Sequence, residues 1–139
     1  MTHRYPVHVH YEDTDMGGIV YHANFLKFIE RARSDWVRDL GVDQNAMRAG
    51  GTVFVVRRIE ADYLAPAYLD DTLGIETRTL RATAARLVME QSVWRGDTRL
   101  FRAVVTVACL TASGRPARLP AAIRDTASAP DQPSPTTRR

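Results

Sequence analysis

The sequence predicts an α+β domain in which one long central helix is wrapped by a five-stranded antiparallel sheet. Large apolar side chains recur at helical spacing between residues 24 and 40, and a face this broad needs a sheet to cover it. One strand pattern precedes the helix, and four strand patterns follow it in succession. Short links between the last strands favour antiparallel pairing, because a parallel crossover needs about a dozen residues.

The first strand is expected where apolar and polar residues alternate from Val7 to Tyr11, and a turn is expected over residues 13–18. The helix begins near Asn24, and Gly41 provides a natural C-terminal stop. The apolar face of the helix comprises Phe25, Phe28, Ile29, Ala32, Trp36 and Leu40. The next four strands are expected at 53–63, 72–81, 86–95 and 100–111, after a loop or short helix over 42–52.

Gly96-Asp97 is typical of a hairpin turn between the last two strands. A long helix wrapped by such a sheet is the hotdog architecture. The edge strands of this sheet remain open, and open edges usually pair with a second chain. We therefore expect a homo-oligomer, a dimer at least.

The domain is expected to span residues 1–124, followed by a disordered tail over 125–139. A chain of 139 residues has the size of a single domain. After Pro120 the sequence becomes rich in Pro, Ser, Thr and Ala and has almost no large apolar side chain. Such a segment buries too little surface to offset the entropy lost on ordering.

Composition and charge exclude several classes of protein. The formal charge is only +3, and the arginines that carry nearly all the positive charge are scattered, whereas nucleic-acid binding needs a clustered stripe. No apolar run approaches the roughly 20 residues that span a bilayer. The first residues show no signal-peptide pattern, and the single cysteine, Cys109, cannot form an internal disulfide. We expect a cytoplasmic protein that binds no nucleic acid.

The most informative segment is the turn that leads into the helix. Asp13 and Asp15 are followed by two glycines, and His22 lies close to the helix start. A carbonyl oxygen near the His22 amide would meet the positive end of the helix, while Asp15 could attack the carbonyl carbon or deprotonate a water. A thiol has a pKa of about 8.5, so a thioester needs little help from a general acid. Ordinary turn and capping chemistry is the alternative interpretation.

Two arginines in the second expected strand could recognise phosphate. Arg57 and Arg58 lie in the middle of the strand, where alternation requires one of them to point toward the core. The guanidinium fork suits the phosphates of a coenzyme. Pairing with Glu60 or Asp62 is the structural alternative.

A row of potential metal ligands lies on the first expected strand. His8, His10 and Glu12 alternate with apolar residues and would share one face. Histidine and carboxylate are common zinc ligands. The polar face of a half-buried strand explains the same pattern more simply, and we expect no metal.

The segment from Tyr11 to Asn24 resembles the active-site segment of the 4-hydroxybenzoyl-CoA thioesterase family. Within this family it is closest to the branch of YbgC-like acyl-CoA thioesterases associated with the Tol-Pal cell-envelope system. The resemblance continues through residues 28–33, 54–58, 63–67, 69–71 and 118–120. It implies the hotdog fold, dimers that often pair into tetramers, and hydrolysis of acyl-CoA without a metal or other cofactor.

The resemblance also implies roles for particular residues. The catalytic aspartate of the family falls on Asp15, the polarising amide falls on His22, and Asp13 is left to the turn. The expected substrate-binding residues are Gly18, Tyr21, Arg57 and Arg58. The substrate is expected to be a short-chain or aromatic acyl-CoA, with an acyl-carrier protein as a further candidate.

Two other functions are compatible with this fold. A hotdog hydratase or dehydratase also acts on acyl thioesters, but such enzymes tend to carry Asn-Pro and a shorter Asp-to-His spacing, which are absent here. A non-catalytic module that binds acyl-CoA or acyl-carrier protein is the second alternative. The intact Asp15 turn argues against it.

Overall fold

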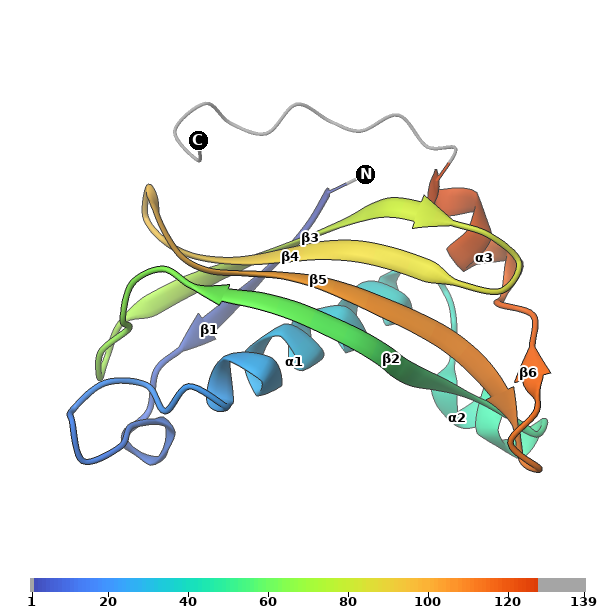
Figure 1. Ribbon diagram of the computed structural model, residues 1–139, viewed down its shortest axis with the longest axis horizontal. Helices are drawn as coiled ribbons and strands as arrows, with labels where there is room; N and C mark the ends of the chain where they lie inside the picture. Colours follow the sequence, from blue (N-terminus) through green and yellow to red (C-terminus); the bar gives the residue numbers. More distant parts are fainter. Residues whose placement is uncertain (1, 128–139) are drawn as a thin grey trace.

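A computed structural model describes residues 2–127 of the chain and confirms the predicted hotdog fold. One long helix, α1 (Asn24–Asp39), lies within the curve of an antiparallel sheet (Figure 1). Within the described residues, no helix is long and apolar enough to cross a membrane.

The sheet has six strands rather than the predicted five. They are β1 (Thr2–His8), β2 (Thr52–Tyr63), β3 (Thr72–Ala82), β4 (Leu87–Arg95), β5 (Thr98–Thr111) and β6 (Pro116–Ala117). Five strands follow the order β1-β3-β4-β5-β2, every pair is antiparallel, and β6 pairs with the end of β5. A two-residue strand such as β6 has no alternation from which a sequence could reveal it.

The first strand ends earlier than predicted. β1 stops at His8, and Tyr11–Asp13 form a single 3-10 turn, η1. The His10 amide donates to the Asp13 carboxylate at 2.8 Å, and the Asp13 amide donates to the His10 carbonyl at 2.9 Å. These local bonds replace the pairing that a longer strand would need, so the alternation through Tyr11 did not indicate a strand.

The helix α1 buries the predicted face against the sheet. Its buried residues are Phe25, Phe28, Ile29, Ala32, Trp36 and Val37. Leu40 is only partly buried, because it lies at the helix end. Gly41 adopts the left-handed conformation (φ 84°), and its amide donates to the Arg38 carbonyl, which ends the helix. Burial of each large apolar side chain contributes about 1.5–3 kcal/mol, and this face therefore holds α1 in place.

Short helices complete the domain. α2 (Gln44–Ala49) occupies the segment predicted as a loop or short helix, and α3 (Ala121–Arg124) leads into a 3-10 turn, η2 (Asp125–Ala127). Thr126 is buried, and its hydroxyl donates to the Ile123 carbonyl at 2.6 Å. Residues 125–127 therefore belong to the packed domain, so the boundary predicted at 124 falls too early. The rest of the predicted tail lies outside the described residues.

The edge of the sheet that β2 forms is exposed in the middle of that strand. β2 ends the strand order, and among the described strands it pairs only with β5. Five consecutive β2 residues, 56–60, are exposed. A half-covered strand would bury every second side chain, so this run marks an edge that residues 2–127 leave uncovered.

Candidate active site

Asp15 opens a tight turn whose backbone is held from both sides. Thr14 and Val20 form an isolated β-bridge. Inside this bridge the Asp15 amide donates to the Ile19 carbonyl at 2.9 Å, and the Gly18 amide donates to the Asp15 carbonyl at 3.0 Å. Gly18 has a φ of 79°, a conformation that side chains disfavour. The turn therefore fixes the position of Asp15 before α1 begins.

The Asp15 carboxylate is exposed and only partly engaged. Its Oδ1 accepts a hydrogen bond from the Gly17 amide at 2.8 Å. No other donor within residues 2–127 reaches this carboxylate, so Oδ2 is open to a substrate or a water. A Cβ on residue 17 would lie 3.2 Å from Oδ1, which explains why glycine suits that position. The arrangement orients the carboxylate and leaves one of its oxygens without a hydrogen-bond partner in the described residues.

Asp13 lies close by in sequence but has a different environment. It is buried, with 8% of its surface exposed, and its carboxylate accepts the His10 amide. Its carbonyl accepts the Tyr21 amide and the Asn24 side-chain amide, both at 2.9 Å. Asp13 therefore ties the turn to the helix start, in agreement with its assignment to the turn.

Two backbone amides just before the helix start have no hydrogen-bond acceptor in the described chain. The Asn24 amide donates to the Tyr21 carbonyl at 2.8 Å, and the Phe25 amide donates to the His22 carbonyl at 3.3 Å. The amides of His22 and Ala23 donate no hydrogen bond to any acceptor in the described chain. Such amides carry the partial positive charge of the helix N-terminus. A substrate carbonyl oxygen could accept from either of them.

A cavity of about 320 Å³ adjoins this helix start. It is lined by Ile19, Val20, His22, Phe25, Tyr63, Leu64, Ala65 and Pro66. Most of these side chains are apolar, as expected of a small-molecule site. The Tyr21 ring lies outside this lining, with its centroid 4.6 Å from that of His22.

Tyr63 is a site residue that the sequence did not indicate. Its hydroxyl donates to the His22 carbonyl at 3.0 Å, and its ring packs against Phe101 with centroids 5.0 Å apart. Partial burial raises the pKa of the Tyr63 phenol above its ordinary value, so the hydroxyl keeps its proton. A tyrosine that ends a strand carries no signal of this contact, because His22 is distant in sequence.

The two arginines are not brought to this cavity by the single chain. A register shift between Val56 and Arg58 interrupts the strand, and both Arg57 and Arg58 are exposed. The prediction that one of them faces the core is therefore wrong. Arg58 pairs with Glu60 at 3.2 Å, which is the structural alternative considered above. Arg58 precedes Tyr63 by five residues, or roughly 16 Å of extended strand.

The row of potential metal ligands considered for the first strand does not lie on one strand face. His8 ends β1, and its Nε2 lies 3.2 Å from an Asp70 carboxylate oxygen. Glu12 lies in the η1 turn instead of on a strand. The rings of His8 and His10 remain neighbours, with centroids 5.0 Å apart.

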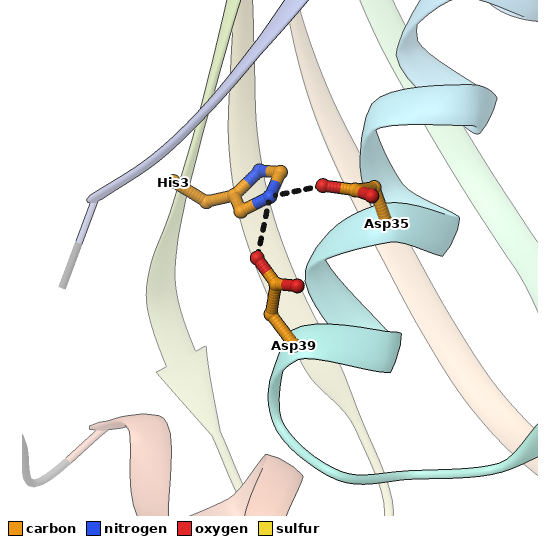
Figure 2. Close-up of side chains that lie close together, drawn as sticks. All are labelled: His3, Asp35 and Asp39. Carbon is orange, nitrogen blue, oxygen red and sulfur yellow. Dashed lines mark hydrogen bonds and ion pairs between the residues drawn. The ribbon is translucent and has the colours of Figure 1, made fainter.

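A different set of potential ligands lies at the other end of α1. Figure 2 shows His3 of β1 between Asp35 and Asp39 of α1, with Nε2 at 2.9 Å and 3.4 Å from their oxygens. The His3 Nδ1 is buried and has no hydrogen-bond partner in the described chain. A metal-bound histidine normally donates its other N–H to an acceptor. This group therefore fits a hydrogen-bonded clasp between β1 and α1 better than a metal centre.

The hotdog fold and the exposed carboxylate turn at the helix start agree with the resemblance to thioesterases, and comparison with known proteins tests that resemblance. The chain matches the Thioesterase superfamily over residues 17–102. It is 44% identical over 108 residues to "Acyl-CoA thioester hydrolase YbgC" of Escherichia coli O6:H1, covering 77% of this chain and 81% of that protein. It is 42% identical over 107 residues to "Acyl-CoA thioesterase YbgC" of Haemophilus influenzae, covering 76% and 79%.

Solved structures agree with this match. A probable thioesterase from Bartonella henselae superposes with a TM-score of 0.84 at 39% identity, covering 86% of this chain and all of that chain. A 1,4-dihydroxy-2-naphthoyl-CoA thioesterase from Synechocystis has the same fold, with a TM-score of 0.84 at 24% identity, and covers 96% of this chain and 100% of that chain. The chain belongs to the thioesterase superfamily, and the predicted resemblance is confirmed.

Proposed function

We propose that this protein hydrolyses acyl-CoA, with Asp15 as the attacking or activating carboxylate. The observation that carries the proposal is the Asp15 carboxylate, which a rigid turn holds before the helix start with one oxygen open. The relatives named as acyl-CoA thioesterases support the substrate class. The superfamily match begins at Gly17, so support for Asp15 is geometric.

The amides at the helix start polarise the substrate in this proposal. The thioester oxygen accepts from the free amides of His22 and Ala23, which stabilise the negative charge that develops on it. Asp15 then either attacks the carbonyl carbon or removes a proton from an attacking water. The coenzyme leaves as a thiolate in both routes.

The two routes differ only in the intermediate. Attack by Asp15 gives a mixed anhydride that a second step hydrolyses, whereas general-base catalysis adds water directly. Both release a carboxylic acid and the free thiol of the coenzyme. The His22 side chain is exposed beside the cavity and orients the water or the carboxylate.

We further propose that the chain is a homodimer at least, paired through β2. Exposed apolar side chains lie along and just beyond this strand: Val53, Val56, Ile59, Tyr63 and Leu64. Pairing with a second copy would cover them and satisfy the open edge. Arg57 and Arg58 lie on the same strand and remain the candidates for the coenzyme phosphates.

A thiol-release assay on a panel of acyl-CoAs tests the proposed function. Short-chain and aromatic acyl-CoAs are expected to release free thiol, and a chelator is expected to leave the rate unchanged. A module that only binds acyl-CoA would release none, and a hydratase would change the acyl chain without releasing thiol. Acyl-carrier protein substrates, a Tol-Pal association, a tetramer and a cytoplasmic location stay predictions.

A further inference from the structure

We infer that Tyr63 is a positioning residue that strengthens the amide of Ala23 as a donor to the substrate oxygen. This inference rests on the proposed function of the helix start. The Tyr63 hydroxyl donates to the His22 carbonyl at 3.0 Å, and the two residues come from β2 and from the segment before α1. Within residues 2–127 the Tyr63 hydroxyl makes no hydrogen bond to Asp15, and in this inference it acts on the substrate oxygen through one peptide group.

That peptide group joins an acceptor to a free donor. The carbonyl of His22 and the amide of Ala23 belong to the same peptide plane. Donation to the carbonyl polarises the plane and makes its N–H a stronger donor, as in chains of hydrogen bonds. The Ala23 amide donates to no acceptor within residues 2–127, so the added polarity is available to a ligand.

The backbone of α1 alone polarises the His22 carbonyl only weakly. Within the described residues, the other donor to the His22 carbonyl is the Phe25 amide at 3.3 Å, which is longer than a typical N–H···O bond. The Tyr63 hydroxyl at 3.0 Å is therefore the closer of the two donors. Without it the carbonyl would keep only the long bond.

Packing holds the Tyr63 hydroxyl in place. The ring lies 5.0 Å from Phe101, 5.8 Å from Phe25 and 6.0 Å from His22, measured between centroids. Three aromatic neighbours restrict the ring, and β2 fixes its backbone. A fixed donor polarises the peptide before substrate arrives, which is the condition for effective electrostatic catalysis.

The experiment compares Tyr63→Phe with a matched control, Tyr68→Phe. In the single chain both tyrosines are about half exposed, at 49% and 47%, and both substitutions remove one hydroxyl. The Tyr68 hydroxyl has no hydrogen bond within the described residues, and its ring lies against Arg95. For Tyr63→Phe we expect kcat for acyl-CoA to fall about 3–10-fold, the scale of one hydrogen bond.

Four other readouts separate positioning from a structural or acid–base role. We expect the KM of Tyr63→Phe to stay within about twofold, its pH–rate profile to keep its shape, and its thermal midpoint to match that of Tyr68→Phe. In NMR spectra the amide proton of Ala23 should move upfield in Tyr63→Phe and stay in place in Tyr68→Phe.

Particular outcomes would overturn the inference. An unchanged kcat or an unmoved Ala23 amide in Tyr63→Phe would remove the positioning role, and loss of one limb of the pH profile would make Tyr63 an acid or base instead. A wild-type protein that releases no thiol would overturn the proposed function, whereas the Ala23 amide shift tests the peptide contact independently of turnover.

Discussion

Replacing Asp15 by asparagine changes the charge of the proposed catalytic group and little of its shape. The bond from the Gly17 amide to Oδ1 survives, because an asparagine side chain also offers an oxygen. The carboxylate is exposed, so folding loses little when the charge is removed. We expect turnover to fall at least about 100-fold, the usual scale for a positioned base.

Asp13→Asn is the control that the chain itself offers. The Asp13 carboxylate is buried and accepts the His10 amide, so its replacement affects stability first. A hydrogen bond from a backbone amide to a charged group contributes about 1.5–3 kcal/mol, of which an asparagine oxygen retains part. We expect Asp13→Asn to lower the thermal midpoint and to reduce turnover less than Asp15→Asn does. Asp15→Asn should reduce turnover strongly and leave the thermal midpoint nearly unchanged.

The assay is thiol release from one responsive acyl-CoA, measured with thermal denaturation on the same preparations. Substrate affinity of Asp15→Asn should be close to that of the wild type, because the proposed coenzyme contacts lie elsewhere. A folded Asp15→Asn protein with near-normal turnover would refute the mechanism. A larger loss of turnover at Asp13 would show that the other carboxylate is catalytic.

Three further substitutions test neighbouring parts of the argument. His22→Ala should lower turnover less than Asp15→Asn, because the backbone amide remains; a loss as large as that of Asp15→Asn in the same assay would assign the chemistry to the imidazole. Gly17→Ala places a Cβ 3.2 Å from the Asp15 Oδ1, and we expect turnover to fall several-fold with little change in thermal midpoint. Ile59→Glu puts a charge on the open β2 edge and should shift light scattering toward the 15.6 kDa monomer. Leu80→Glu puts the same charge on an exposed residue of β3, an inner strand of the sheet, and should not shift it.

Periodicity in the sequence determined the long elements. The apolar spacing from Phe25 to Leu40, with Gly41 as the stop, placed the end of α1 within a residue of the observed Asp39, because a helix face must bury its large side chains. Alternation located β2 to β5 with shifts of one or two residues at their ends. The motif from Tyr11 to Asn24 identified the family, since it is a contiguous run that needs no tertiary information.

The family resemblance assigned different roles to the two carboxylates, but only the tertiary structure showed the physical difference between them. Asp13 and Asp15 are the same residue type two positions apart, and the sequence alone left turn chemistry open for both. The Asp13 carboxylate lies against the His10 amide and away from water, while Asp15 points to solvent with one oxygen unbonded. Burial and partner, which decide whether a carboxylate is structural or reactive, depend on how the loop folds.

Contacts between distant segments were also invisible in the sequence. The bulge at Arg57 exposed both arginines, and the His22 peptide received a hydrogen bond from Tyr63, 41 residues further along the chain. The periodicity of apolar residues indicates which face of a helix or strand is buried. It indicates neither the register of two paired strands nor a contact between the end of a strand and the start of a helix. Those features arise when the sheet curves around α1, because the curvature determines which backbone groups come within bonding distance.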